Sequence, residues 1–134
     1  MGAKLNHIAI VVEDLDKAVE VYRDAIGLHL ESIGEEPGEA VRMAFFPTAA
    51  GEIELIQPTT ADSGVAKYLA KRGEGLHHIC LEVESIEATT REMAARGMEV
   101  LGQVRTNTRG DKYIFIHPKS AHGVLIELYE AATV

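Results

Sequence analysis

The chain contains one pattern twice, and this repeat constrains its fold more than any other feature. In residues 5–14 and again in residues 76–85, a leucine and a polar residue precede a histidine, an apolar run follows, and acidic residues lead into a helical pattern. His7 and His78, the histidines of the two copies, lie 71 positions apart. The chain is therefore expected to consist of two like units, each too small to close a core alone.

Two further features recur at nearly the same offset. Gly27 and Gly97, which each follow a helical pattern, lie 70 positions apart. Glu54 and Glu127, which each occupy an Ile-Glu-Leu triplet, lie 73 positions apart. Loop insertions of a few residues account for the drift, so the order of the elements is expected to recur as well.

The first unit, about residues 4–58, is expected to have the order β-α-β-β-β. Residues 5–12 have the β-branched content of a strand that is covered on both faces, and Asp14 is expected to cap a helix that Gly27 ends. The helical period places six side chains on one face: Leu15, Ala18, Val19, Tyr22, Ala25 and Ile26. Strands are expected at residues 28–33, 41–46 and 52–57, with a loop at 34–38 and a turn at 49–51.

Residues 59–74 are expected to connect the units through a short helix, capped by Asp62 or Ser63 and closed by Gly73. The second unit, about residues 75–130, is expected to repeat the order of the first. Its expected elements are a strand at 78–83, a helix capped by Ser85 and ended by Gly97 with Ile86, Thr89 and Met93 facing inward, and strands at 99–104, 113–117 and 123–129. The predicted fold class is α+β, a single domain in which the two βαβββ units form a curved mixed sheet around a central cleft.

The composition is that of a globular domain and excludes some functions. Of the 134 residues, 46 % are hydrophobic and 25 % are charged, so the chain can bury a core without disulfides. One cysteine, with no signal peptide or long apolar run, predicts a reducing cytoplasmic location and no membrane partner. The net charge of −8 argues against nucleic-acid binding, although a local basic cluster can still hold an anionic small substrate.

The repeated histidines and glutamates predict a metal centre in the cleft. Alternate side chains of a strand share a face, so Glu54 and Glu127 point away from their Ile and Leu neighbours and toward the concave side of the sheet. Carboxylates that line such a cleft repel one another, and a divalent cation supplies the counter-charge. His7, Glu54, His78 and Glu127, with positions left for water or substrate, suit zinc, cobalt, nickel, manganese or iron.

The alternative is that each of these side chains is an ordinary polar residue at a strand end or on an exposed face. That alternative holds for each residue taken singly, and the repetition of both types favours the metal centre. His77 must point away from the face of His78, and Cys80 is expected to be a small buried hydrophobe. His29, His117 and His122 have no repeat partner and are assigned to loops or the surface, while Arg105, Arg109, Lys112 and Lys119 either hold an anionic substrate or are solvated.

The paired units with their two histidines and two glutamates resemble the vicinal oxygen chelate (glyoxalase/bleomycin resistance) superfamily over the whole chain. Within it, three stretches are similar to the methylmalonyl-CoA epimerase family: residues 62–69, residues 71–78, and residues 115–120 leading into 123–128. Related glyoxalases usually carry an Asp-Pro-Asp-Gly type of turn where this chain has His-Pro-Lys-Ser at 117–120.

The resemblance implies an isomerase that binds one divalent metal ion, cobalt before zinc, manganese or nickel, and an acyl-CoA substrate. The ion stabilises the enolate that forms when the proton alpha to the thioester leaves, and acid/base groups on both sides of the carbon invert its configuration. Glu127 matches a family position that serves both the metal and proton transfer, and Glu54 is the candidate partner base. The chain departs from some members at two places, where Arg42 and Met43 replace an acidic position and residues 106–111 replace a glycine-rich loop.

Two alternatives stay open. A glyoxalase I-like lactoylglutathione lyase uses similar ligands and also removes a proton alpha to a carbonyl. A non-enzymatic binding protein shares the architecture but commonly lacks the ligands, and the presence of all four argues against it. A homodimer is the expected assembly.

Overall fold

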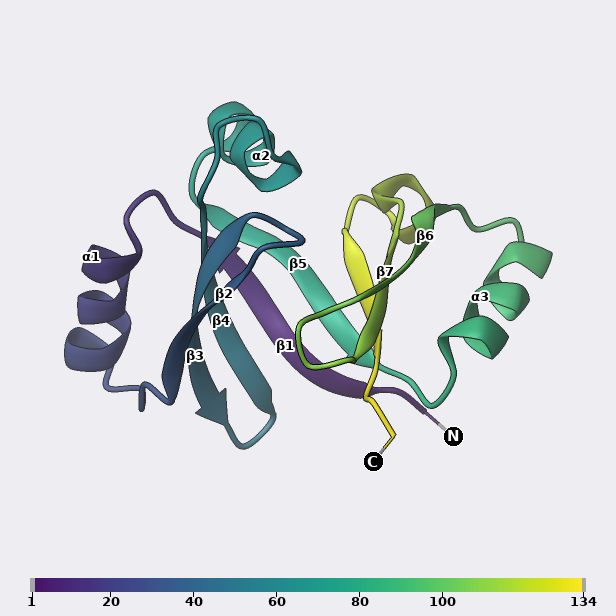
Figure 1. Ribbon diagram of the computed structural model, residues 1–134, viewed down its shortest axis with the longest axis horizontal. Helices are drawn as coiled ribbons and strands as arrows, with labels where there is room; N and C mark the ends of the chain where they lie inside the picture. The colour runs from purple at the N-terminus through teal and green to yellow at the C-terminus, as the bar shows by residue number, and fades with distance from the viewer. Residues whose placement is uncertain (1, 134) are drawn as a thin grey trace. The chain divides into compact units, whose positions relative to one another are not determined.

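The computed structural model describes residues 2–133, which form two compact units. One unit comprises residues 7–77, and the other comprises residues 78–133 together with residues 2–6. In chain order, the elements within the described residues are β1 (Lys4–Val11), α1 (Leu15–Glu20), β2 (Ser32–Glu36), β3 (Val41–Thr48), β4 (Gly51–Pro58), α2 (Gly64–Arg72), β5 (Gly75–Glu82), α3 (Ile86–Ala95), β6 (Val100–Thr106), β7 (Lys112–Ile116) and β8 (Ile126–Glu130) (Figure 1). The predicted α+β class and the repeated β-α-β-β-β order are confirmed.

The strands pair in the same way in both units. In the first, the order is β2-β3-β4-β1, with β1 parallel to β4 and the other pairs antiparallel. In the second, the order is β6-β7-β8-β5, with β5 parallel to β8 and the other pairs antiparallel. Each unit therefore brings the strand that opens on histidine next to the strand that carries the Ile-Glu-Leu triplet.

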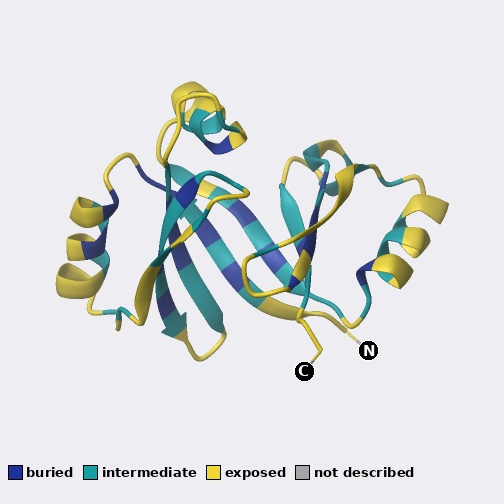
Figure 2. Ribbon diagram, in the orientation of Figure 1, coloured by how far each residue is buried: buried dark blue, intermediate teal, exposed yellow. Residues whose placement is uncertain are grey.

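Helix α1 covers one face of the first sheet. Asp14 caps it by accepting a hydrogen bond from the Lys17 amide, as predicted, and the Gln57 side chain of β4 accepts from the Leu15 amide at 2.7 Å. The packed residues are Val12, Leu15, Val19, Ala44, Phe46 and Leu55, all buried (Figure 2). His7 and Glu54 lie on the opposite face of β1 and β4, which this core does not cover.

Helix α2 covers one end of that opposite face. Ser63 caps it, accepting from the Ala66 amide at 3.0 Å, and Gly73 ends it with a φ of 77°. Val65, Tyr68 and Leu69 of the helix pack against a cluster of strand residues: Ala9, Val11, Val41, Met43 and Ile56. The helix thus lies toward the carboxyl ends of β1 and β4, beyond His7 and Glu54.

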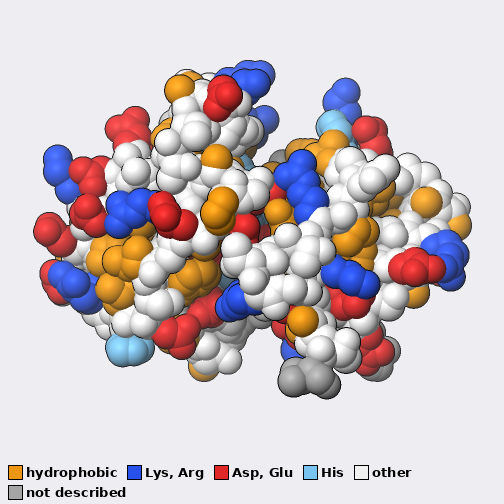
Figure 3. All heavy atoms as spheres, viewed as in Figure 1, with side chains coloured by type: hydrophobic (Ala, Val, Ile, Leu, Met, Phe, Trp, Pro, Cys, Tyr) orange, Lys and Arg blue, Asp and Glu red, His pale blue; other side chains and the backbone are white. Residues whose placement is uncertain are grey.

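Helix α3 covers one face of the second sheet. Ser85 caps it, accepting from the Ala88 amide at 3.1 Å, and the Glu130 side chain of β8 accepts from the Ile86 amide at 2.8 Å. The buried residues of this core are Ile86, Ile114, Ile116 and Leu128. On its exposed side, α3 carries ion pairs from Arg91 to Glu87 and from Arg96 to Glu92, and Figure 3 shows acidic and basic side chains side by side over this helix.

The structure corrects three predicted elements. The strand expected at 28–33 is Ser32–Glu36, so the expected loop at 34–38 is wrong; Leu28 and Leu30 pack against the α1 core without a strand partner. The strand expected at 123–129 starts at Ile126, because residues Pro118–Ala121 form a 3₁₀ turn and His122 and Gly123 have positive φ values of 55° and 95°.

The third correction concerns the end of the first helix. After Glu20 the chain continues as a π-helix, Val21–Ala25, in which the Ile26 amide donates to the Val21 carbonyl at 2.9 Å. This wider turn changes the angular period, so Ala25 and Ile26 do not share the buried face of Leu15, and Ile26 is 57 % exposed. Gly27 does end the helix, with a φ of 89°. Among residues 2–133, no helix has the length and apolar content to cross a membrane.

Candidate metal centre

The first unit brings together His7 of β1 and Glu54 of β4. In the parallel pairing of these strands, Ala9 lies opposite Glu54, and His7 is two residues before Ala9 on the same face. His7 Nε2 lies 3.3 Å from Glu54 Oε2, and the two residues are only 8 % and 7 % exposed. The predicted association of this histidine with this glutamate is therefore present in the structure.

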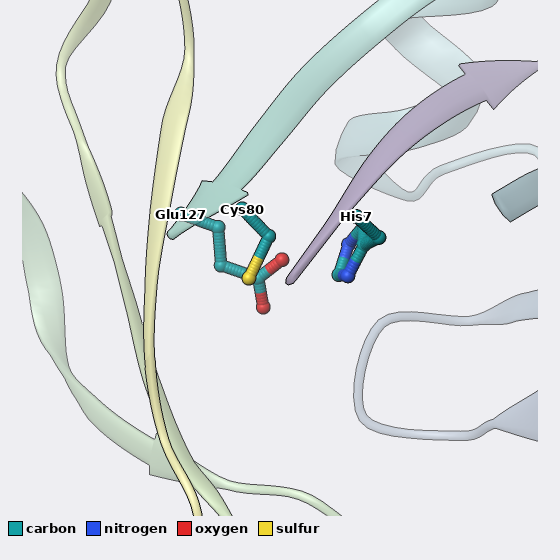
Figure 4. Close-up of side chains that lie close together, drawn as sticks. All are labelled: His7, Cys80 and Glu127. Atoms are coloured by element: carbon teal, nitrogen blue, oxygen red, sulfur yellow. The ribbon is translucent and has the colours of Figure 1, made fainter. Parts of the chain in front are cut away.

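The second unit builds the same pair from β5 and β8. Cys80 lies opposite Glu127, and Figure 4 shows their side chains side by side on the two strands. His78, two residues before Cys80, places its Nε2 3.0 Å from Glu127 Oε1. The ring of Phe115 meets the His78 imidazole edge-on, at 5.4 Å between centroids and 89° between planes. This contact fixes the imidazole plane on one side.

Each pair has the donor chemistry and spacing of two neighbouring ligands of one cation. Metal bonds of about 2.0–2.2 Å to imidazole nitrogen and carboxylate oxygen place adjacent ligand atoms about 2.9–3.5 Å apart. The observed separations of 3.3 Å and 3.0 Å lie in that range. Near-complete burial of the two histidines restricts their rotation, so that the nitrogens stay directed at the carboxylates. The residues present thus fit a divalent metal ion.

The first pair has acidic neighbours. Glu52 lies two residues before Glu54 on β4, and its pKa is raised by burial, then by repulsion from and hydrogen bonding to Glu31, and by the nearby Glu54 carboxylate. His7 partly opposes these effects. Three acidic side chains thus lie near one another beside the pair, and their mutual repulsion favours a bound cation there.

The remaining histidines and the cysteine behave as the sequence predicted. His77 packs edge-on against Tyr68 at 4.6 Å, away from the face of His78. Cys80 is fully buried. His29 and His122 are exposed, and His117 accepts a hydrogen bond from the Lys119 amide through Nδ1 at the start of the 3₁₀ turn.

Among the candidate substrate-binding cations, Arg109 and Lys112 lie close to carboxylates. Arg109 Nε lies 3.5 Å from Asp111, and Lys112 Nζ lies 4.0 Å from Glu130. Arg42, at the departure from the family pattern, faces α1 and lies 3.5 Å from Asp16. The other residue at that departure, Met43, faces the α2 side of the sheet and is half-buried. Met43 therefore places an apolar side chain on the Glu54 face of the sheet.

Sequence reasoning missed a buried carboxylate, Asp111. It accepts hydrogen bonds from the Tyr129 hydroxyl, from the Ala132 amide at 2.8 Å and from Asn107 at 3.3 Å. Burial acts to raise the pKa of Asp111, but these hydrogen bonds together outweigh it and hold that pKa below its ordinary value. Burial and the Asp111 carboxylate raise the pKa of Tyr129. The cluster connects the β6–β7 turn to β8, two residues beyond Glu127.

Tyr129→Phe is expected to lower the free energy of unfolding at pH 7 by about 1.5–3 kcal/mol, the usual range for a hydrogen bond to a charged group. The folded-state pKa of Asp111 is depressed, so its contribution is present above the ordinary carboxyl pKa and is lost as the pH falls through the folded value. Urea unfolding should show the difference between the variant and the parent shrinking as the pH falls below the ordinary carboxyl pKa. A double-mutant cycle of Tyr129→Phe and Asp111→Asn measures the coupling energy between the two side chains. A difference in unfolding free energy between variant and parent that is equal at all pH values would contradict this explanation.

Two aromatic residues were also missed. Phe45 lies opposite Glu54 on β3, and Phe115 lies opposite Glu127 on β7. They are 70 positions apart, so the same repeat that identified the histidines and glutamates could have identified these two phenylalanines.

Comparison with known proteins agrees with the fold. The model of the Glyoxalase/Bleomycin resistance protein/Dioxygenase superfamily matches residues 6–115. An ethylmalonyl-CoA/methylmalonyl-CoA epimerase of Cereibacter sphaeroides is 37 % identical over 131 residues, covering 96 % of this chain and 98 % of that protein. The chain also resembles solved structures at high coverage.

Methylmalonyl-CoA epimerase from Mycobacterium tuberculosis is 36 % identical with a TM-score of 0.88, covering 97 % of this chain and 89 % of that one. A Streptomyces coelicolor methylmalonyl-CoA epimerase variant in complex with 2-nitronate-propionyl-CoA gives the same identity and TM-score, covering 97 % and 98 %. The chain belongs to the glyoxalase/bleomycin resistance protein/dioxygenase superfamily and, within it, to the methylmalonyl-CoA epimerase family. The predicted family and the predicted racemase/epimerase class of enzyme are confirmed.

Proposed function

We propose that His7, Glu54, His78 and Glu127 bind one divalent cation, and that the chain uses it to epimerise methylmalonyl-CoA. The observation that carries the proposal is the presence of a largely shielded His–Glu pair in each unit, with nitrogen–oxygen separations of 3.3 Å and 3.0 Å. The relatives' names, and the acyl-CoA analogue bound to one of them, support the substrate. The bound ion supplies Lewis acidity that stabilises the enolate of the thioester.

The glutamates have a second role in this proposal. Inversion at the alpha carbon needs one group that removes the proton from one face and one that returns a proton to the other. Glu127 and Glu54 are assigned to these two faces. One carboxylate takes the alpha proton while the electron pair moves into the thioester enolate. The other, as a carboxylic acid, delivers a proton to the opposite face of the carbon.

The burial of the pairs supports this chemistry. A carboxylate that is shielded from water beside an imidazole interacts more strongly with developing charge than an exposed one does. The edge-on Phe115 ring keeps the His78 imidazole in place, so the ligand geometry does not have to reorganise during the reaction. A homodimer and a cytoplasmic location complete the proposal, and sedimentation and fractionation test these two points.

The test is deuterium uptake at C2 of methylmalonyl-CoA in heavy water, followed by mass spectrometry. We expect uptake with the protein as purified, loss after removal of metal by a chelator, and recovery on addition of Co²⁺, with Zn²⁺, Mn²⁺ and Ni²⁺ as further arms. Full uptake by metal-free protein would reject the metal centre. No uptake, together with turnover of a glutathione hemithioacetal, would assign the chain to the lactoylglutathione lyases instead.

A further inference from the structure

The two glutamates have the same surroundings in both units. Glu54 lies between Ala9 on β1 and Phe45 on β3, and Glu127 lies between Cys80 on β5 and Phe115 on β7. Residues directly opposite one another on neighbouring strands share a face and have Cβ atoms about 4.5–5.5 Å apart. Each glutamate therefore has a small side chain on its histidine side and a phenyl ring on the other.

The two phenyl rings differ in what holds them. Phe115 contacts the His78 imidazole edge-on, and it also meets the ring of buried Tyr113 at 6.2 Å and 85°. These contacts on two sides fix Phe115 as a support for the histidine. Its position is therefore set by the second unit's own packing.

Phe45 lies beside a more flexible side chain. Its neighbour on the same face of β3 is Met43, which is half-buried like Phe45 itself and packs against the α2 cluster. A methionine side chain has three rotatable bonds and fills irregular space. The surface beside Glu54 is thus apolar, partly accessible and able to adapt, whereas the residue between them in sequence, Ala44, is fully buried on the α1 side.

The substrate of the proposed reaction needs such a surface. Its alpha carbon carries a thioester carbonyl, a carboxylate, a hydrogen and an alkyl branch. The oxygens require polar partners, and the hydrogen must face a glutamate, so the alkyl branch is the group left for an apolar wall. Glu54 is one of the proposed proton-transfer groups, and the side chain directly opposite it, Phe45, is the apolar candidate for that wall.

We propose that the Phe45 ring is the wall against which the alkyl branch of the substrate packs, and that it sets the largest branch the enzyme accepts. This inference rests on the function proposed above. Branch size is a real variable among relatives, because the Cereibacter sphaeroides protein is named for both ethylmalonyl-CoA and methylmalonyl-CoA. A pocket that gains or loses room for one methylene changes discrimination between substrates by about 10–200-fold.

The experiment compares Phe45→Ala and Phe45→Leu with the matched control Phe115→Leu. For each protein, kcat/KM for deuterium uptake is measured with methylmalonyl-CoA and ethylmalonyl-CoA. We expect Phe45→Ala to raise the ethyl-to-methyl ratio by about 10-fold or more, with a smaller rise for Phe45→Leu. Phe115→Leu should lower uptake with both substrates by a similar factor, because it loosens His78 without enlarging the wall.

A binding measurement gives a readout that does not depend on turnover. Dissociation constants for 2-nitronate-propionyl-CoA and its butyryl counterpart should change in the same ratio as the kinetic constants in the Phe45 variants. Circular dichroism identifies any variant that fails to fold, and Phe45→Leu decides if Phe45→Ala does fail. The inference is overturned if the Phe45 variants leave the ratio within twofold of the parent, or if Phe115→Leu shifts it as much. Failure of the proposed function is distinct, since the unmodified protein would then exchange neither substrate.

Discussion

The His78→Ala variant is expected to bind a divalent cation at least about 100-fold more weakly than the parent and to lose epimerase activity, while remaining folded. Replacement of a residue that only orients a metal ligand already costs about 10–100-fold in affinity, and removal of the ligand itself is expected to cost more. His78 Nε2 lies 3.0 Å from Glu127, so the variant also leaves that carboxylate without its imidazole neighbour. Isothermal titration with Co²⁺ measures the affinity, and deuterium uptake measures the activity.

The adjacent residue supplies the matched control. His77 is also a histidine of β5, but its ring packs against Tyr68 and does not share the face of His78. His77→Ala should therefore keep the metal affinity of the parent. Normal turnover by His78→Ala, or an equal loss of metal in both variants, would contradict the assignment of His78 as a metal ligand.

The pairs could be predicted because they are repeated and because strand alternation fixes their side. An offset of 71–73 positions identified His7, His78, Glu54 and Glu127 from the sequence alone. The same offset also relates Gln57 to Glu130, which lie 73 positions apart and accept hydrogen bonds from the first amide of α1 and of α3. Residues with the same structural role in both units can thus be identified from a single sequence.

Features that occur once were not recoverable. The buried state of Asp111 is one of these features, because it depends on Tyr129 and Ala132, which approach it only when β7 and β8 pair. The strand bounds failed for a related reason. Leu28 and Leu30 alternate like strand residues, but a strand also needs a partner, and the β2–β3 ladder begins at Ser32.

Glu127→Gln tests the chemical step, and its expected result separates two roles of one residue. Glutamine keeps an oxygen of the same reach as the carboxylate, so the variant should retain metal binding at reduced affinity. It cannot accept the alpha proton, and loss of a general base typically lowers the rate by about 10²–10⁴-fold. Epimerisation, measured as loss of optical purity of a single enantiomer of methylmalonyl-CoA, should fall by that factor.

Proton exchange should respond differently from epimerisation. If Glu127 and Glu54 serve opposite faces of the alpha carbon, Glu127→Gln blocks exchange of the enantiomer whose hydrogen faces Glu127. The other enantiomer still exchanges its proton for deuterium through Glu54, with retention of configuration. Glu54→Gln should show the reverse preference. Equal loss of exchange for both enantiomers in Glu127→Gln, with no effect of Glu54→Gln beyond weaker metal binding, would make Glu127 the sole base. Because the two carboxylates hold equivalent places in the two units, opposite enantiomer preferences are the signature that the repeat predicts.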